Sequence, residues 1–504
     1  MRNSAFLLYL LFSVSQVYTQ DSPAVALDNA IEKGMELFEI PAFALGIVHK
    51  GEIIYEKAYG YADAESKREA DINTVFGVAS CSKAFTAACI ATLVDEGKLD
   101  WDDHVIEYLP EFRLHDPWIT SELTIRDLLC HRAGYDTFDG DLLWYGSSYN
   151  REEVLERFGH RENEYSLRSV FGYSNIMYIA AGEVIREVAG MTWDQYVDAR
   201  FFEPLGMMHT NTSNSDFTTE MNVALPHLDG EPMEFINYDN CGPAASINST
   251  IPDLLEWVQL WLDKGMAHDE RIFSAEQYYA MTSSITPMQG VRGEEPGGIH
   301  FYSYGLGWFL HDYAGRKVIQ HGGGVPGFHS KVCFVPEDSL GFVILSNELS
   351  GLLEAMTWKV LDVFLKDTDA DPVTEYFERF ERIDAMKEET ARQQDMARIT
   401  GTAPSLEPAG FTGLYEDDMY GRAEVELQND TLVLKLLPSE ELFTARLEHW
   451  HYNTFSFRFN DPFLPRGFAT FHISNSGKPA WFTIDLDNPD FLFYKLKFVK
   501  INND

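Results

Sequence analysis

The sequence of 504 residues contains only five cysteines, and its 39 Lys and Arg residues are outnumbered by 79 Asp and Glu residues. Five scattered cysteines are too few for a disulfide scaffold, and their odd number leaves at least one without an intrachain partner. The formal net charge of -40 repels nucleic acid and anionic membrane surfaces, which we exclude as partners. After residue 20, no apolar run reaches the roughly 18 residues of a membrane-spanning helix, so we expect no membrane span.

Metal-binding spacings are also missing. The chain has no C-x-x-C, H-E-x-x-H or EF-hand pattern, so we expect neither a catalytic metal nor another cofactor. His449 and His451 lie two residues apart on one face of an expected strand, a spacing that a metal pair can use. Packing inside a small β domain explains the same two residues, and we favour that interpretation.

The first 20 residues have the pattern of a secretory signal peptide. Arg2 gives a basic start, residues 5–14 are apolar, and short side chains precede an expected cleavage near Thr19 or Gln20. This pattern predicts a secreted, extracellular protein, in which Asn-x-Ser/Thr sequons can carry glycans. Sequons occur at Asn211, Asn248 and Asn429.

The rest of the chain predicts two domains and a linker. Residues 25–365 have strands at both ends and helices between them, which indicates one α/β domain whose sheet is closed by the two ends of the segment. Residues 371–404 are charged and helix-favouring, which is typical of a helical linker. Residues 405–504 contain short alternating apolar runs broken by Gly, Asn and Asp, and they predict a small antiparallel barrel or sandwich.

A single S-x-x-K sequence runs from Ser80 to Lys83. Apolar residues recur at helical spacing from Phe85, and Gly97 favours a helix end, so Ser80 is expected at a helix N-terminus. Lys83 shares a helix face with Ser80, and free backbone N–H groups point to the same place. A nucleophile, an amine and oxyanion donors are the parts of an acyl-transfer site. An N-cap serine followed by a solvated lysine has the same pattern, so other motifs must decide.

Later stretches supply such motifs. They are FGYSN with Tyr173 and Asn175, LTIRDLLCHRAGY at 123–135, and QHGGG with His321, Gly322, Gly323 and Gly324. A second Y-x-N, at 238–240, lacks the F-x-Y-S-N surroundings and the apolar helix that follows them. We therefore assign the role to the first.

In this order, S-x-x-K, Y-x-N and H-G-G resemble the serine β-lactamase-like family in its class C branch, which includes D-peptidases and small-ester hydrolases. The stretches PLGM, STIPDLLEW and YGLGW extend the resemblance over residues 25–365. It implies an α/β domain, of α+β type, with an antiparallel sheet flanked by helices, as in penicillin-binding proteins. The last 100 residues are similar to the small all-β, barrel-like domain appended to some members.

The resemblance implies an acyl-enzyme mechanism. Ser80 would attack an acyl carbon while Lys83 accepts its proton, which requires the lysine pKa of about 10.4 to be lowered by burial or a cationic neighbour. Tyr173 would relay a proton to the leaving group and help to activate the deacylating water. That role requires its pKa of about 10 to be depressed by Lys83 and His321. The backbone N–H groups of Ser80 and Gly324 would form the oxyanion hole.

The remaining motif residues would shape the substrate site. Asn175 would bind a substrate amide or orient Lys83. His321 replaces the lysine of the commoner K-T-G, and an uncharged imidazole holds a substrate carboxylate less firmly, so a small peptide, amide or ester is expected rather than a β-lactam. Gly322 and Gly323 lack side chains, which lets a substrate lie close to the strand edge.

Two functions stay open. The first is a secreted serine hydrolase. The second is an acidic extracellular matrix protein with weak or no catalysis, because the chain also resembles shell-matrix (gigasin-like) proteins that carry the same domain. Its partner would be calcium or a mineral surface. The retained catalytic residues favour the first function, and the net charge favours the second.

Overall fold

The structure, a computed structural model, describes residues 22–288, 299–366 and 370–501. The expected signal peptide, residues 1–20, lies outside the described residues. Within the described ranges, no helix combines the length and apolar character that a membrane crossing requires.

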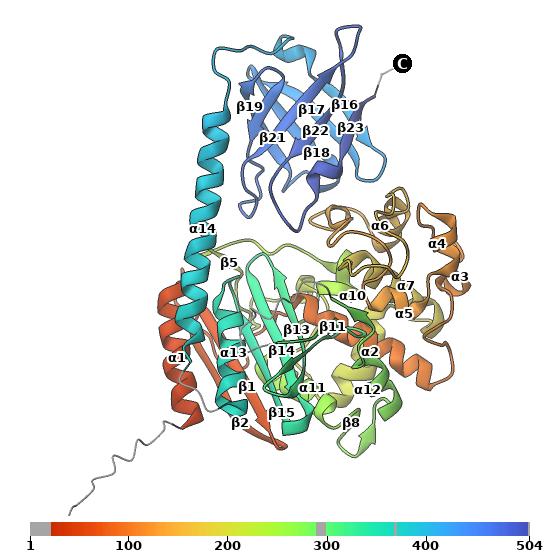
Figure 1. The fold of residues 1–504 in the computed structure, drawn as a ribbon, viewed down its shortest axis with the longest axis vertical. Coiled ribbons are helices and arrows are strands. Elements are labelled where there is room, and N and C mark those ends of the chain that lie inside the picture. The colour runs from red at the N-terminus through yellow and green to blue at the C-terminus, as the bar shows by residue number, and fades with distance from the viewer. Residues whose placement is uncertain (1–21, 289–298, 367–369, 502–504) are drawn as a thin grey trace, which may run out of the picture.

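The N-terminal domain is built around a nine-stranded antiparallel sheet with the order β10-β11-β12-β13-β14-β15-β1-β2-β3 (Figure 1). Its strands are β1 (Ala42–His49), β2 (Glu52–Asp63), β3 (Arg68–Glu69), β10 (Thr286–Pro287), β11 (Tyr302–Tyr304), β12 (Phe309–Tyr313), β13 (Arg316–Val325), β14 (Phe328–Val335) and β15 (Leu340–Ser346). Phe43 of β1 lies opposite Ser346 of β15. The two ends of the domain therefore meet in the sheet, as the sequence predicts.

Helices cover both faces of this sheet. On one face, α1 (Pro23–Phe38) and α13 (Leu352–Leu365) bury an apolar cluster with the strands. On the other, α11 (Ile251–Leu262) packs against β1, where Gly46 leaves room: a Cβ there would lie 2.6 Å from Ile251. Behind the sheet, α2 (Ser82–Asp95) contacts α7 (Asn175–Ala189) and α10 (Gly242–Ala245). Every residue of α2 from Ser82 to Leu93 is buried, as expected for a helix that is mostly apolar around its whole circumference.

Smaller elements complete this domain. The other helices are α3 (Val105–Tyr108), α4 (Pro117–Glu122), α5 (Ile125–Leu129), α6 (Arg151–Phe158), α8 (Trp193–Val197), α9 (Glu203–Leu205) and α12 (Ala275–Met281). Short strand pairs are β4 (Phe76–Gly77) with β7 (Asn248–Ser249), β5 (His227–Leu228) with β6 (Glu231–Pro232), and β8 (Met266–Ala267) with β9 (Glu270–Arg271).

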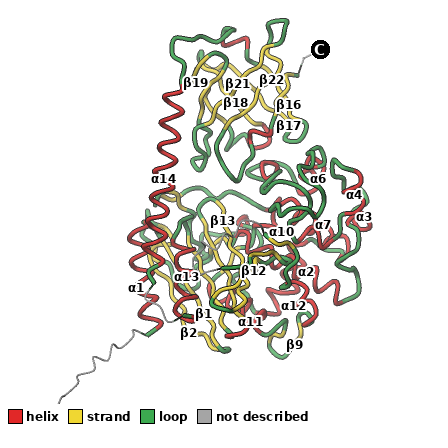
Figure 2. The backbone as a smooth tube through the Cα atoms, viewed as in Figure 1, coloured by secondary structure: helices red, strands yellow, loops and turns green. Residues whose placement is uncertain are grey.

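The C-terminal domain is a closed eight-stranded antiparallel barrel, visible as the upper, strand-rich part of Figure 2. Its strands are β16 (Gly413–Asp417), β17 (Gly421–Gln428), β18 (Thr431–Leu436), β19 (Thr444–His451), β20 (Thr454–Phe457), β21 (Gly467–Ile473), β22 (Pro479–Asp485) and β23 (Lys497–Lys500). Each strand pairs with the next, and β23 returns to β16. Aromatic rings such as those of Tyr415, Phe471 and Phe482 fill the interior. The structure thus selects the barrel over the sandwich.

A single long helix, α14 (Pro372–Ala397), runs from the N-terminal domain along one side of the molecule to the barrel (Figure 1). At 1.5 Å per residue its 26 residues span about 39 Å. Only Pro372 and Val373 are buried. At its far end, the Arg398 guanidinium donates to the carbonyl oxygens of His449 and Trp450.

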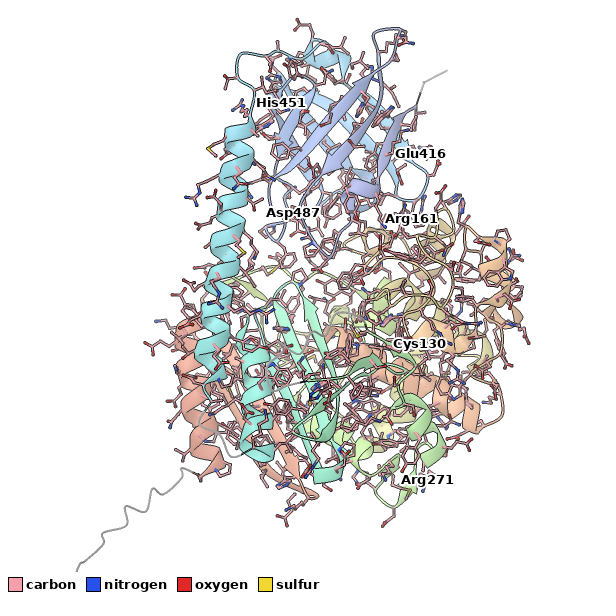
Figure 3. The ribbon with its side chains drawn as sticks, viewed as in Figure 1. Cys130, Arg161, Arg271, Glu416, His451 and Asp487 are labelled. Carbon is pink, nitrogen blue, oxygen red and sulfur yellow. The ribbon has the colours of Figure 1, made fainter. Side chains whose placement is uncertain are left out.

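The barrel also contacts the N-terminal domain directly. The Tyr145 hydroxyl donates to Asp461, and the Tyr149 hydroxyl donates to the Tyr420 carbonyl, both at 2.9 Å. Figure 3 places Asp487 at the end of the barrel that faces the N-terminal domain. The barrel is therefore held by α14 and by a packed interface.

Candidate active site

Ser80 lies in a tight turn directly before α2. The turn is a 3-10 helix, Ala79–Cys81, and Ala79 adopts a φ of 47°, a conformation that non-glycine residues seldom take. The Val78 N–H donates to the Ile247 carbonyl, which holds the turn against β7. Ser80 is partly exposed and lines a cavity of about 500 Å³. The turn therefore presents the hydroxyl to this cavity at the start of the helix.

The Lys83 side chain is fully buried beside Ser80. Its Nζ lies 3.1 Å from Ser80 Oγ, 2.5 Å from Asn175 Oδ1 and 3.1 Å from the Ala244 carbonyl oxygen. Burial lowers the pKa of Lys83 to about 8. Amide and carbonyl oxygens can only accept, so a neutral Lys83 donates its two hydrogens to Asn175 Oδ1 and the Ala244 carbonyl oxygen. Its lone pair then faces the Ser80 hydroxyl.

Asp141 extends this network, and no motif in the sequence marks it. Asn175 Nδ2 donates to Asp141 Oδ2 at 2.7 Å, so the carboxyl fixes the amide that contacts Lys83. Asp141 is buried at the start of a 3-10 turn, and burial raises its pKa to about 8. In the sequence, Asp141 is only a polar residue that follows a glycine, and this pattern does not indicate a site. The structure therefore adds Asp141 to the residues predicted from the motifs.

Tyr173 lies over the Lys83 ammonium, with 4.6 Å between Nζ and the ring centroid. Burial raises the pKa of Tyr173 well above 10, and the nearby Ser80 opposes this only in part. This corrects the expectation of a depressed pKa, because loss of solvent around the hydroxyl outweighs the effect of a buried neighbouring amine. Tyr173 is thus a neutral phenol, suited to donate a proton.

His321 lies on β13 with both ring nitrogens occupied. Its Nδ1 is 2.6 Å from the Gly322 carbonyl, which can only accept, so Nδ1 carries the hydrogen. Nε2 therefore accepts from the Tyr304 hydroxyl at 3.0 Å. Burial lowers the pKa of His321 to about 3. The imidazole is neutral, as expected, and it supplies no charge that could depress the pKa of Tyr173.

The glycines after His321 differ in how tightly they are enclosed. A Cβ on Gly323 would lie 2.2 Å from the Val78 carbonyl oxygen and 2.9 Å from the Ser80 nitrogen, both backbone atoms. A Cβ on Gly324 would meet only side chains, that of Leu349 at 3.1 Å and that of His329 at 4.0 Å. Gly324 is exposed to the cavity that Ser80 lines. The strand thus approaches the Ser80 turn as closely as a main chain can.

A lysine from the neighbouring strand lies beside this strand. Lys331 of β14 pairs in register with Gly322, and a Cβ on Gly322 would be 3.2 Å from Lys331 Nζ. The Lys331 ammonium bonds Glu354 at 2.6 Å and Gln320 at 3.2 Å. A cation therefore lies beside the strand that carries His321 and Gly322, but a carboxylate already neutralises it. Sequence spacing gives no signal for Lys331, because the strand register brings it there.

The cavity is shared between the two domains. Barrel residues Phe463, Asp490 and Phe491 line it together with Ser80 and His321. A second cavity, of about 610 Å³, adjoins it at the domain boundary and shares Thr137, Phe171 and Met288 with it, but Ser80 does not line it. The smaller cavity is therefore the candidate active site.

Two other groups of polar residues lie outside the cavity. Asp136, Asp139 and Glu164 approach one another closely enough to ligate a cation, but the Lys495 ammonium from the barrel occupies this position at 2.6 to 3.1 Å. Of the sequons, Asn429 is exposed and Asn211 is half-buried. Asn248 is only 7% exposed, and its Nδ2 donates to Asn211 and Ser246. Burial leaves no room for a glycan at Asn248, which corrects that part of the prediction.

Comparison with known proteins agrees with this fold. The Beta-lactamase family model matches residues 27–363, and the model of a domain of unknown function, DUF3471, matches residues 397–500. Among curated proteins, Protein flp of Staphylococcus aureus (strain NCTC 8325 / PS 47) is 25% identical over 367 residues, which are 70% of each chain. The unguisins hydrolase ungD' of Aspergillus campestris is 27% identical over 421 residues, 78% of this chain and 76% of that protein.

Solved structures show the same architecture. The octameric penicillin-binding protein homologue from Pyrococcus abyssi superposes with a TM-score of 0.58 at 21% identity, over 94% of this chain and 99% of that one. The D-amino acid amidase from Ochrobactrum anthropi SV3 gives a TM-score of 0.55 at 22% identity, over 67% of this chain and 98% of that one. The chain therefore belongs to the β-lactamase family of hydrolases, with a DUF3471 barrel as its second domain.

Proposed function

We propose that the protein is a serine hydrolase that cleaves an amide or ester through an acyl-enzyme on Ser80. The observation that carries this proposal is the set of three oxygens around Lys83 Nζ. The oxygens of Asn175 and Ala244 can only accept, so the lone pair of the neutral amine is directed at the Ser80 hydroxyl. Burial brings the pKa of Lys83 to about 8, so a useful fraction of the amine is neutral near neutral pH.

The reaction follows from this geometry. Ser80 Oγ attacks the acyl carbon while its proton passes to Lys83, and backbone N–H groups of Ser80 and Gly324 stabilise the oxyanion. The bond to the leaving group breaks, and the neutral Tyr173 phenol donates the proton that this group needs, regaining one from Lys83. Water then attacks the Ser80 ester and gives one proton to the neutral Lys83, which passes it to Ser80 Oγ as the ester bond breaks. The carboxylic acid leaves with the other hydrogen of the water. Asn175 and Asp141 keep the amine in place throughout.

Small amides and esters fit the cavity better than β-lactams. Both nitrogens of His321 are occupied, and Lys331 is neutralised by Glu354, so neither offers a free cation to a β-lactam carboxylate. The names of the unguisins hydrolase and the D-amino acid amidase also point to peptide-like amides.

Labelling with a fluorophosphonate tests the proposal. The adduct should map to Ser80 and should be absent in Ser80→Ala, while the exposed barrel variant Ser476→Ala should label like the parent. Equal labelling of Ser80→Ala, or an adduct on another serine, would refute the assignment.

We also propose secretion, on the basis of residues 1–20. Expression in a eukaryotic host should release into the medium a chain that begins near Asp21. Retention of an uncleaved chain inside the cell would contradict it.

The matrix function has a separate basis, the net charge of -40. None of the relatives named above carries a matrix protein's name. Scattered carboxylates would bind calcium weakly and at many sites, so millimolar calcium should raise the melting temperature gradually, and Ser80→Ala should adsorb to calcium carbonate like the parent. Adsorption no greater than that of an unrelated protein of equal charge density would leave the hydrolase as the function.

A further inference from the structure

The barrel contributes part of the wall around the Ser80 cavity. Phe463 comes from the loop between β20 and β21, and Asp490 and Phe491 come from the loop after β22. These loops project from the end of the barrel that faces the N-terminal domain, where Figure 3 shows Asp487 of the same loop. A substrate bound at Ser80 therefore meets side chains of both domains.

The loop that carries Asp490 is held in one conformation. Asn488 Oδ1 accepts from the backbone N–H groups of Asp490 at 2.8 Å and Phe491 at 3.1 Å. The Phe491 ring packs 4.3 Å from that of Tyr145, centroid to centroid. Just beyond the loop, Lys495 binds its carboxylate cluster in the other domain. Such fixation reduces the ordering cost of a contact with substrate.

Asp490 is the cavity carboxylate without a compensating charge among the described residues. Glu354 is paired with Lys331, and Asp141 is bonded by Asn175 and, with a pKa of about 8, is mostly protonated at neutral pH. The Asp490 side chain is half-buried, and burial alone raises its pKa. A half-buried carboxylate without a partner is a binding site for a cationic group.

The surrounding surface suits an organic cation. Phe463 and Phe491 of the barrel and Phe138 and Trp144 of the N-terminal domain line the same cavity as Asp490. Aromatic faces attract ammonium groups and bury the apolar carbons attached to them. A hydrated metal ion needs several oxygen ligands, whereas the other two carboxylates of the cavity, Asp141 and Glu354, are already bonded to Asn175 and Lys331.

We propose that the Asp490 carboxylate binds a primary ammonium group of the substrate, so that the barrel selects acyl donors with a free amine, such as amino-acid or peptide amides and esters. The inference rests on the proposed hydrolase function for the identity of the reacting site. The chemistry at Ser80 stays with the N-terminal domain, and Asp490 acts by binding.

Equilibrium binding tests this inference without catalysis. In the Ser80→Ala protein, calorimetry compares phenylalanine amide with N-acetylphenylalanine amide, each as both enantiomers. We expect the free amine to bind at least about tenfold more tightly, since a hydrogen bond to a charged group contributes about 1.5–3 kcal/mol. Adding Asp490→Asn should abolish the preference, and adding Asp487→Asn, an exposed change in the same loop, should preserve it. The inference is overturned if the preference for the free amine survives Asp490→Asn. It is also overturned if the protein with Asp490 intact shows no preference.

Kinetics of the full chain separate binding from chemistry. With Ser80 intact, Asp490→Asn should raise KM for a free-amine ester about tenfold and change kcat less than about threefold, while the N-acetyl ester is unaffected. An equal loss for both esters would mean a structural role and overturn the inference. Failure of the hydrolase proposal has a different signature, because it would abolish Ser80 labelling and leave the calorimetric preference intact.

Discussion

The two domains reach the same cavity by different routes. In the N-terminal domain, Ser80 and Lys83 lie at the start of α2, and Tyr173 and Asn175 lie at the start of α7. Strand β13, which carries Gly323, forms another side of the site. The barrel contributes side chains from loops, and none of them belongs to a motif. The contrast indicates that bond-making groups need fixed elements with close backbone approach, whereas selecting groups can come from loops of an appended domain.

The largest effect should come from filling the space at Gly323. Gly323→Ala should reduce the rate of Ser80 acylation at least about 100-fold, because a Cβ would displace Ser80 relative to its partners. Gly324→Ala keeps the backbone N–H assigned to the oxyanion hole, and its Cβ would meet only the side chains of Leu349 and His329, so this matched control should lose little. Stopped-flow labelling measures both. Equal rates for the two variants would contradict the inference that the close backbone approach at Gly323 keeps Ser80 in position.

The next effect concerns pH. The reactive form of Lys83 is the neutral amine, and its pKa is about 8, so the acylation rate should rise about tenfold per pH unit up to about pH 8 and then level off. Burial also raises the pKa of Asp141 to about 8, so Asp141 gains its charge over the same pH range as Lys83 loses its own, and the ionised carboxylate raises the pKa of Lys83. Asp141→Asn should therefore shift the rise to lower pH, measured as a pH–rate profile. An unshifted rise would mean that Asp141 is not coupled to the amine.

A moderate effect is expected at the domain interface. Lys495→Met leaves Asp136, Asp139 and Glu164 without their shared cation, and we expect a loss of about 2 kcal/mol of unfolding free energy, less than for a fully buried pair because Arg161 still pairs with Asp139. Lys478→Met, at an exposed barrel position, is the control and should unfold like the parent in urea. In Lys495→Met, KM should also rise more than kcat falls. Unchanged stability and KM would mean that the Lys495 contacts do not hold the barrel in place.

The smallest effect on activity should follow cleavage of the connecting helix. Limited proteolysis should cut first between Asp371 and Pro408, because α14 is exposed beyond Val373. The two fragments should stay together through their interface and retain Ser80 labelling, but they should separate in Lys495→Met. First cuts within residues 120–340 would contradict the proposed domain boundary, and a nicked chain that separates at once would show that α14 alone holds the barrel.

The sequence predicts most of the fold and the motif residues because both depend on local spacing. Ser80 and Lys83 are three residues apart on one helix, and the alternating C-terminal runs require an antiparallel sheet. Lys331 and Asp490 could not be predicted, because strand register and the position of the barrel bring them to the cavity. The predicted direction of the Tyr173 pKa shift was wrong for a similar reason, because the solvent exposure of a hydroxyl depends on the tertiary structure.

The pairing of β1 with β15 has a consequence for how the chain is made. Phe43 leaves the ribosome about 300 residues before its partner Ser346, a delay on the order of 15–60 s at roughly 5–20 residues per second. Until then β1, which is buried along almost its whole length in the finished protein, lacks one of its neighbours. The barrel has a shorter delay, since its strands pair with sequence neighbours except where β23 closes onto β16, with Lys500 about 85 residues after its partner Tyr415. The nascent N-terminal half is therefore prone to aggregation during synthesis, and a chaperone that covers β1 or faster translation would reduce that risk.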